Sequence, residues 1–151
     1  MALKRNTTQD GGDDRTLRLS ALPFDAKKLE AYIRYATVLL SALGGPGFQV
    51  PGTEPFVQAH EASLKASGLT ARELEALRSS VRRFTGNRFS VQLLKERLAL
   101  AADPEVRTNL AEELARVEKQ LPRRESEETI SLLFTREVVL MQLRGALGSW
   151  A

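Results

Sequence analysis

Apolar side chains recur every three or four residues through most of the chain, which is the spacing of one face of an α-helix. Five segments show this pattern, and capping or helix-breaking residues bound them. The expected helices cover residues 26–43, 55–66, 71–102, 104–121 and 127–147. No segment alternates apolar and polar side chains as a half-buried strand does. The pattern predicts an all-α protein, an antiparallel four- to five-helix bundle with short connections.

The longest predicted helix also has the clearest start signal. Thr70 and Glu73 have the spacing of a capping box just before an apolar periodic run. The apolar positions keep their helical phase through Gly86, although a glycine inside a helix costs about 1 kcal/mol relative to alanine. We therefore predict one continuous helix over 71–102, with a kink or a close helix crossing at Gly86.

The predicted helix over 127–147 is more apolar than one buried face requires. Its main apolar face contains Ile130, Phe134 and Met141. Leu132, Val139 and Leu143 lie off that face, and Trp150, the only tryptophan, follows the helix. Because tryptophan is enriched in interfaces, we hypothesise that these four residues bind a protein partner or a second copy of the chain. In the alternative, the helix is central in the bundle and Trp150 covers its end.

The chain divides into a polar N-terminal segment and one domain. Residues 1–22 lack an apolar period and are expected to form a flexible tail, whereas residues 23–151 form a single helical domain. No apolar signal segment is visible near the N-terminus. The longest uncharged run, Tyr35–Thr53, contains glycines and prolines that would interrupt a membrane-spanning helix. We therefore expect no membrane span and a cytoplasmic location.

The residue types needed for common catalytic and metal sites are scarce. The chain has no cysteine and one histidine, which excludes disulfides, thiolate nucleophiles and a multi-histidine metal centre within one chain. Adjacent acidic residues on a helix point about 100° apart and do not converge. We expect no catalytic residue, no metal site and no cofactor, and thus not an enzyme. A weaker alternative is a small helical enzyme or ligand carrier with His60 lining a pocket.

The charge pattern adds a second candidate surface. Lys and Arg total 22 and Asp and Glu total 19, so the net charge is only +3. Four arginines nevertheless gather on the longest predicted helix: Arg78, Arg82, Arg83 and Arg88. We expect this basic patch to steer acidic partners toward a non-catalytic protein-interaction or regulatory module. The alternative is a nucleic-acid-binding regulator that uses the same arginines, with weak affinity because the net charge is small.

Overall fold

The computed structural model describes residues 24–44 and 53–148, and these residues form helices and connections without any strand. The elements are α2 (Ala26–Ala42), α3 (Glu54–Ser67), α4 (Ala71–Leu100), α5 (Pro104–Glu118), the 3₁₀ turn η1 (Leu121–Arg123), α6 (Glu127–Thr135) and α7 (Glu137–Leu147). The prediction of an all-α fold is confirmed. The predicted tail over 1–22 and Trp150 lie outside the described residues. None of the described helices is both long and apolar enough to cross a membrane.

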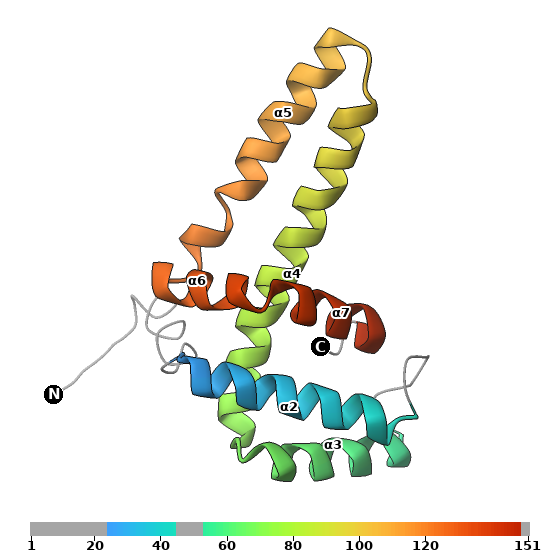
Figure 1. Cartoon of the computed structure of the whole chain (residues 1–151), viewed down its shortest axis with the longest axis vertical. Helices are drawn as coiled ribbons and strands as arrows, with labels where there is room; N and C mark the ends of the chain where they lie inside the picture. The colour runs from blue at the N-terminus through green and yellow to red at the C-terminus, as the bar shows by residue number, and fades with distance from the viewer. Residues whose placement is uncertain (1–23, 45–52, 149–151) are drawn as a thin grey trace, which may run out of the picture.

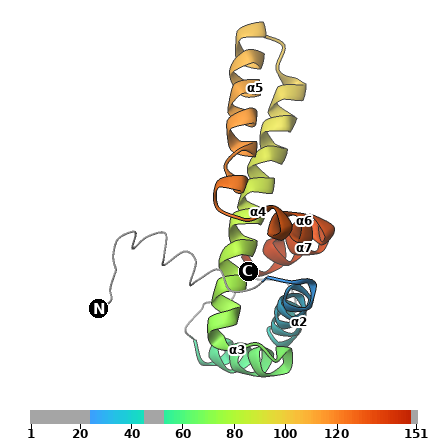
Figure 2. The ribbon, with the colours of Figure 1, turned by 90° about the vertical axis from the view of Figure 1, so that its left-hand side faces the viewer.

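Helix α4 is the element around which the others are arranged. Its first half packs against α2, α6 and α7, while α3 lies beside α2 and runs in the opposite direction (Figure 1). Its second half projects beyond this group and pairs with α5 in an antiparallel hairpin (Figure 2). One helix therefore contributes to two separate apolar clusters.

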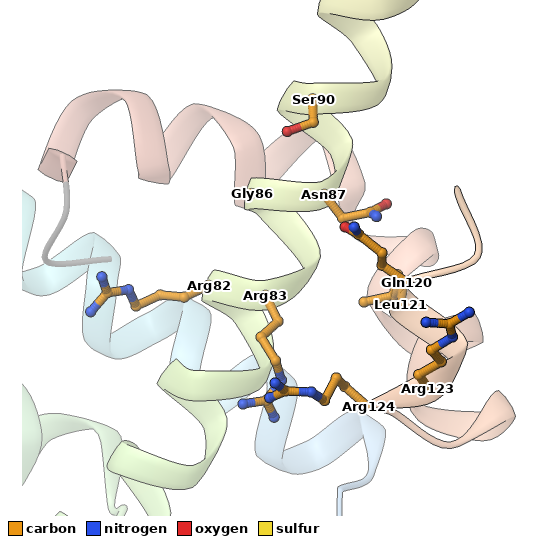
Figure 3. A pocket seen from close by; sticks show the side chains of 9 residues that line it. All are labelled: Arg82, Arg83, Gly86, Asn87, Ser90, Gln120, Leu121, Arg123 and Arg124. Carbon is orange, nitrogen blue, oxygen red and sulfur yellow. The ribbon is translucent and has the colours of Figure 1, made fainter. Parts of the chain in front are cut away.

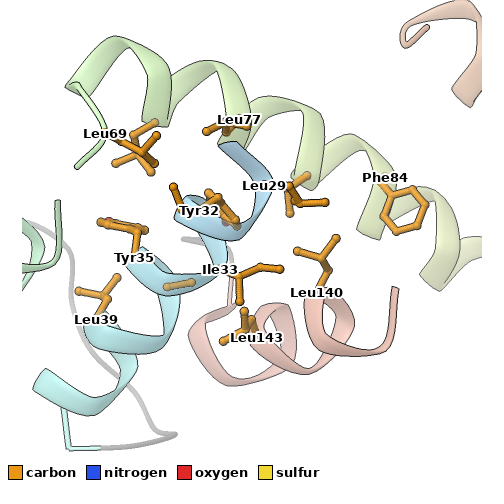
Figure 4. Close-up of a cluster of buried hydrophobic side chains, with 14 of the residues drawn as sticks. Leu29, Tyr32, Ile33, Tyr35, Leu39, Leu69, Leu77, Phe84, Leu140 and Leu143 are labelled. Atoms are coloured by element: carbon orange, nitrogen blue, oxygen red, sulfur yellow. The ribbon is translucent and has the colours of Figure 1, made fainter. Parts of the chain in front are cut away.

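The larger cluster fills the space between α2, α3, the first half of α4, α6 and α7 (Figure 4). Its most deeply buried large side chains come from α2, α4, α6 and α7: Leu29, Tyr32, Tyr35, Leu39, Val81, Phe84, Leu133 and Leu140. Burying each of these side chains contributes roughly 1.5–3 kcal/mol relative to exposure, so this cluster holds the domain together.

The smaller cluster lies inside the hairpin. Val91 and Leu94 of α4 pack with Val117 of α5, and Leu110 and Leu114 are partly buried against them. The side-chain amide of Asn87 donates a 2.8 Å hydrogen bond to the carbonyl oxygen of Val117. That carbonyl lies in the last turn of α5 and also accepts a 3.1 Å hydrogen bond from the Gln120 amide, so the Asn87 bond ties α4 to the end of α5.

The start of α4 forms as predicted. Thr70 Oγ1 accepts a 3.1 Å hydrogen bond from the Glu73 amide, and Glu73 Oε1 accepts a 3.0 Å bond from the Thr70 amide. The helix then continues through Gly86, which confirms a single helix over this region. The close helix crossing expected at Gly86 is absent, because a Cβ added there would meet no atom of the described residues within 4 Å.

Two predicted helices end differently in the structure. The helix expected over 127–147 is interrupted at Arg136, which separates α6 from α7. No glycine or proline marks this position, and the break coincides with an ion pair between Arg136 and Glu30 of α2. Helix α5 ends at Glu118, and Pro122 lies within η1 and does not directly follow the helix.

We expect the Glu73 carboxylate to make folding sensitive to acid. The pKa of Glu73 is lowered, first by the hydrogen bond from Lys28 and then by the Thr70 amide. A lowered folded-state pKa contributes stability above the unfolded pKa of about 4.3, and this contribution is lost as the pH falls through the folded value. Glu73→Gln should therefore lower the urea midpoint at pH 7 and have a smaller effect at pH 3. The exposed Glu61→Gln change is the control, and an equal effect at both pH values would contradict the prediction.

Candidate functional site

A line of exposed apolar side chains runs along the projecting half of α4. Phe89, Leu93 and Leu100 are 42%, 47% and 86% exposed. At 100° per residue they lie within about 40° of one another, roughly opposite the Val91 and Leu94 face that packs on α5. We call these three residues the α4 seam. With Glu96 between the leucines, the spacing is four, three and four residues, as in the contact positions of a coiled coil.

Two charged residues accompany the α4 seam. Glu96 occupies the remaining contact position of the seam, and Arg97 lies on its edge, as the helical angle between neighbours requires. Both residues are exposed. Neither forms an ion pair with any residue that the structure describes. The seam therefore combines apolar contact positions with two charges that have no ion-pair partner among the described residues.

Most arginines of the predicted basic patch are engaged within the fold. The ion pairs are Arg78 with Glu75 at 3.2 Å, Arg83 with Glu125 at 2.6 Å, and Arg88 with Glu137 at 2.8 Å. Arg82 has no ion pair within residues 24–44 and 53–148. Because three of the four charges are offset by carboxylates, the patch presents a weaker field than four isolated arginines would.

Glu125 is the most buried of these carboxylates, with 5% of its side chain exposed. Its Oε2 accepts hydrogen bonds from Arg83 Nη2 at 2.6 Å and Nε at 3.0 Å, and its Oε1 accepts one from Ser80 Oγ at 2.6 Å. Charge-assisted bonds of this kind are stronger than neutral ones. Glu125 thus fixes the segment before α6 to the middle of α4.

A pocket of about 510 Å³ lies between α4 and the η1 segment (Figure 3). We call it the arginine pocket. It is lined by α4 residues between Arg82 and Ser90 and by Gln120, Leu121, Arg123 and Arg124. In Figure 3, Arg83 and Arg124 extend toward one another, while the Arg82 guanidinium extends away from them. Arg123 and Arg124 are exposed and form no ion pair among the described residues.

The residues proposed to form a C-terminal binding face lie against the domain interior. Leu143 is 8% exposed and belongs to the large apolar cluster, while Leu132 and Val139 are partly buried against it. The buried face of α6 and α7 carries Leu133, Leu140 and Leu143. The main face expected from the sequence, with Phe134, is therefore not the buried one, because Phe134 is an exposed large apolar residue.

The exposed large apolar side chains of α6 and α7 are Phe134 and Val138. The Phe134 ring meets Phe84 edge-on at a centroid distance of 5.1 Å. The Arg88 guanidinium lies 4.9 Å from the centre of the same ring, a cation–π contact. Arg88 therefore links α4 to α6 through Phe134 and to α7 through its ion pair with Glu137.

Two polar groups at least partly buried lie near the arginines of α4. The Tyr32 hydroxyl is buried without a hydrogen-bond partner among the described residues, and burial raises the pKa of this phenol above its usual range. Arg144 Nη1 donates a 2.7 Å hydrogen bond to Thr85 Oγ1. Partial burial, followed by the nearby Arg82 charge, lowers the pKa of Arg144.

His60 lies at the edge of the large cluster. Its Nδ1 shares a 2.7 Å hydrogen bond with the Tyr35 hydroxyl, and the two rings meet edge-on at 5.7 Å. Within the ranges that the structure describes, no three histidine, aspartate or glutamate side chains are grouped closely enough to hold a metal ion.

Sequence reasoning missed the α4 seam and the pair Arg123 and Arg124. The seam does carry a signal, since Phe89, Leu93 and Leu100 occupy heptad positions. That signal was hidden by a second heptad on the same helix, which includes Val91 and forms the smaller core. The pocket had no local signal, because its two walls are about 40 residues apart in the chain.

Comparisons with known proteins give no assignment: no family model, no curated protein and no solved structure matches this chain.

The position of Leu143 predicts a stability effect. Leu143→Ser should lower the free energy of unfolding by about 3 kcal/mol, because it removes a buried side chain and introduces a hydroxyl. Val138→Ser, at a 69% exposed neighbour, should change it by about 0.5 kcal/mol or less. Urea titration followed by circular dichroism measures both values. Equal effects of the two changes would show that Leu143 is not a core residue.

Removing Glu125 should also destabilise the fold. Glu125→Ala leaves Arg83 and Ser80 without their acceptor, and we expect a loss of about 2 kcal/mol, since water reaches part of the Arg83 side chain. Glu128→Ala, an exposed change in the first turn of α6, should cost about 0.5 kcal/mol or less. Thermal unfolding compares the two variants. Indistinguishable melting temperatures would contradict the anchoring role of Glu125.

Proposed function

We propose that this protein is a non-catalytic interaction module whose projecting hairpin pairs with the same hairpin of a second copy. The observation that carries the proposal is the α4 seam, with Phe89, Leu93 and Leu100 exposed in heptad register. The seam points away from α5, so the hairpin's own core does not use it. Because α5 packs on the opposite face of α4, two hairpins paired through their seams would place the two α4 helices at the centre and each α5 on the outside.

The energetic reason is the apolar area left exposed in a single copy. Burying an apolar side chain of this size contributes roughly 1.5–3 kcal/mol. A symmetric pair buries the seam residues of both copies, so each residue contributes once per copy. Heptad spacing keeps such residues on one line, which allows side chains of the two helices to interdigitate along the contact. The gain is offset in part by the entropy lost on association.

The glutamate within the seam favours one orientation. In a parallel pair each contact position faces its own copy, so Glu96 would face Glu96. In an antiparallel pair with Phe89 of one copy opposite Leu100 of the other, Glu96 faces Leu93 and the two carboxylates are displaced along the contact. Like charges across a helix contact are unfavourable, so we propose the antiparallel arrangement.

The sequence also led us to expect a non-catalytic interaction module, but it placed the binding surface on the C-terminal helix and not on the α4 seam. Leu132, Val139 and Leu143 are largely committed to the monomer's interior, whereas the α4 seam is exposed. The alternative of a nucleic-acid-binding regulator using Arg78, Arg82, Arg83 and Arg88 stays a prediction.

The direct test is the molecular mass in solution. The wild-type chain should sediment as a dimer, and Leu93→Glu with Leu100→Glu should give a monomer with unchanged helical circular dichroism, because both leucines are exposed. The matched control is Ala111→Glu with Ala115→Glu, which adds the same charge at exposed positions of α5 and should remain dimeric. A wild-type monomer at 100 μM, or dimeric seam variants, would overturn the proposal.

Cysteine cross-linking tests the orientation. The chain contains no cysteine, so single substitutions give unambiguous cross-links. In an antiparallel pair, Leu100→Cys should form no disulfide with its own copy, because Leu100 lies at one end of the seam. An equimolar mixture of Phe89→Cys and Leu100→Cys should form a disulfide-linked dimer under mild oxidation, since the two ends of the seam meet. Glu112→Cys, at an exposed position of α5, should form none. A disulfide dimer of Leu100→Cys alone would contradict the antiparallel arrangement.

A further inference from the structure

We infer that the arginine pocket between α4 and η1 binds the phosphate group of a small soluble molecule. This site lies apart from the α4 seam and does not depend on self-association. Its volume of about 510 Å³ falls within the range of about 300–1,000 Å³ typical of small-molecule sites. Three observations support an anionic occupant: the excess of positive charge, the fixed position of one guanidinium, and the glycine in its wall.

The positive charge around the pocket exceeds the negative charge available to it. Arg83, Arg123 and Arg124 line the pocket, and only Arg83 has a carboxylate partner among the described residues. That partner, Glu125, already accepts three hydrogen bonds and is almost fully buried. Bringing Arg124 toward Arg83 costs repulsion that a bound anion would remove. A group with several negative oxygens fits this arrangement.

The guanidinium of Arg83 is held in place before any ligand arrives. Its Nε and Nη2 both donate to Glu125, which fixes the orientation of the planar group. Because Glu125 occupies the Nε–Nη2 edge, Nη1 is the Arg83 donor left for a phosphate oxygen, and a fixed donor loses little entropy on binding. Arg123 and Arg124 then supply adjustable donors from η1, where they are neighbours in the chain.

Gly86 lies in the wall of the pocket. Packing does not require a glycine there, because an added Cβ would meet no described atom within 4 Å, and its backbone is helical. The helix nevertheless lacks a side chain at this one position, beside Asn87 and Ser90. The consequence is open space next to the arginines, together with the polar groups that could fix a ligand's orientation.

The test is calorimetric titration with pyrophosphate at constant ionic strength. The wild-type chain should bind it, and Arg123→Gln with Arg124→Gln should weaken binding by about tenfold or more, as expected for losing a charge-assisted hydrogen bond. The control, Lys27→Gln with Lys65→Gln, removes the same charge at exposed positions outside the pocket and should keep the wild-type affinity. Circular dichroism confirms that each variant is folded.

A second variant tests the shape of the site without removing charge. Gly86→Leu places a side chain in the pocket and improves helix propensity, so the protein should stay folded while pyrophosphate binding falls by about tenfold. No pyrophosphate binding by the wild type would overturn the proposal, as would equal affinity in both charge variants. A mixed-sequence single-stranded oligonucleotide is titrated in parallel. Binding of the oligonucleotide alone, lost in the Arg123 and Arg124 variant, would reject a small-molecule site in favour of a nucleic-acid surface.

Discussion

The buried Glu125 carboxylate is the contact on which the arrangement of the two halves depends. After α5 the chain has to return from the projecting hairpin to the main apolar cluster, and Glu125 fixes this return to the middle of α4 through Arg83 and Ser80. Because α6 begins two residues later, the same anchor sets where α6 and α7 cross α4. Asn87 adds a bond to the end of α5, one turn further along.

The sequence was informative where local chemistry decides the structure. The capping box at Thr70, the glycine after α3 and the aspartate before Pro104 each mark a boundary that the structure contains. It was less informative over residues 127–147, where several helix faces are apolar. There the choice of buried face depends on which surfaces of α2 and α4 are nearby. The apolar periodicity of a segment does not indicate which surfaces of other helices it will meet. The break at Arg136 coincides with a tertiary ion pair to Glu30 of α2, which the local pattern does not indicate either.

The two candidate sites differ in how well the sequence alone predicts them. The α4 seam lies on a single helix, so its heptad spacing is visible in the sequence. It can be recognised once the competing heptad around Val91 is assigned to the hairpin core. The arginine pocket arises only when η1 is brought against α4, and Arg123 and Arg124 are unremarkable surface residues until then. Of the four arginines singled out in the sequence, Arg83 and Arg88 pair with carboxylates outside α4, since long cationic side chains on a packed helix are also well placed to hold its neighbours.

The sharing of α4 between two apolar clusters has a consequence for local opening. The hairpin cluster is small and packs α5 against one helix, so α5 should separate transiently without disturbing the larger cluster. The reverse does not hold, because unfolding the first half of α4 removes the support from which its second half extends. Amide hydrogens of α5 should thus exchange through a low-energy local motion, and those of α4 near Phe84 only through global unfolding. The larger apolar cluster would thus unfold only with the whole domain, whereas α5 would open and close locally against α4.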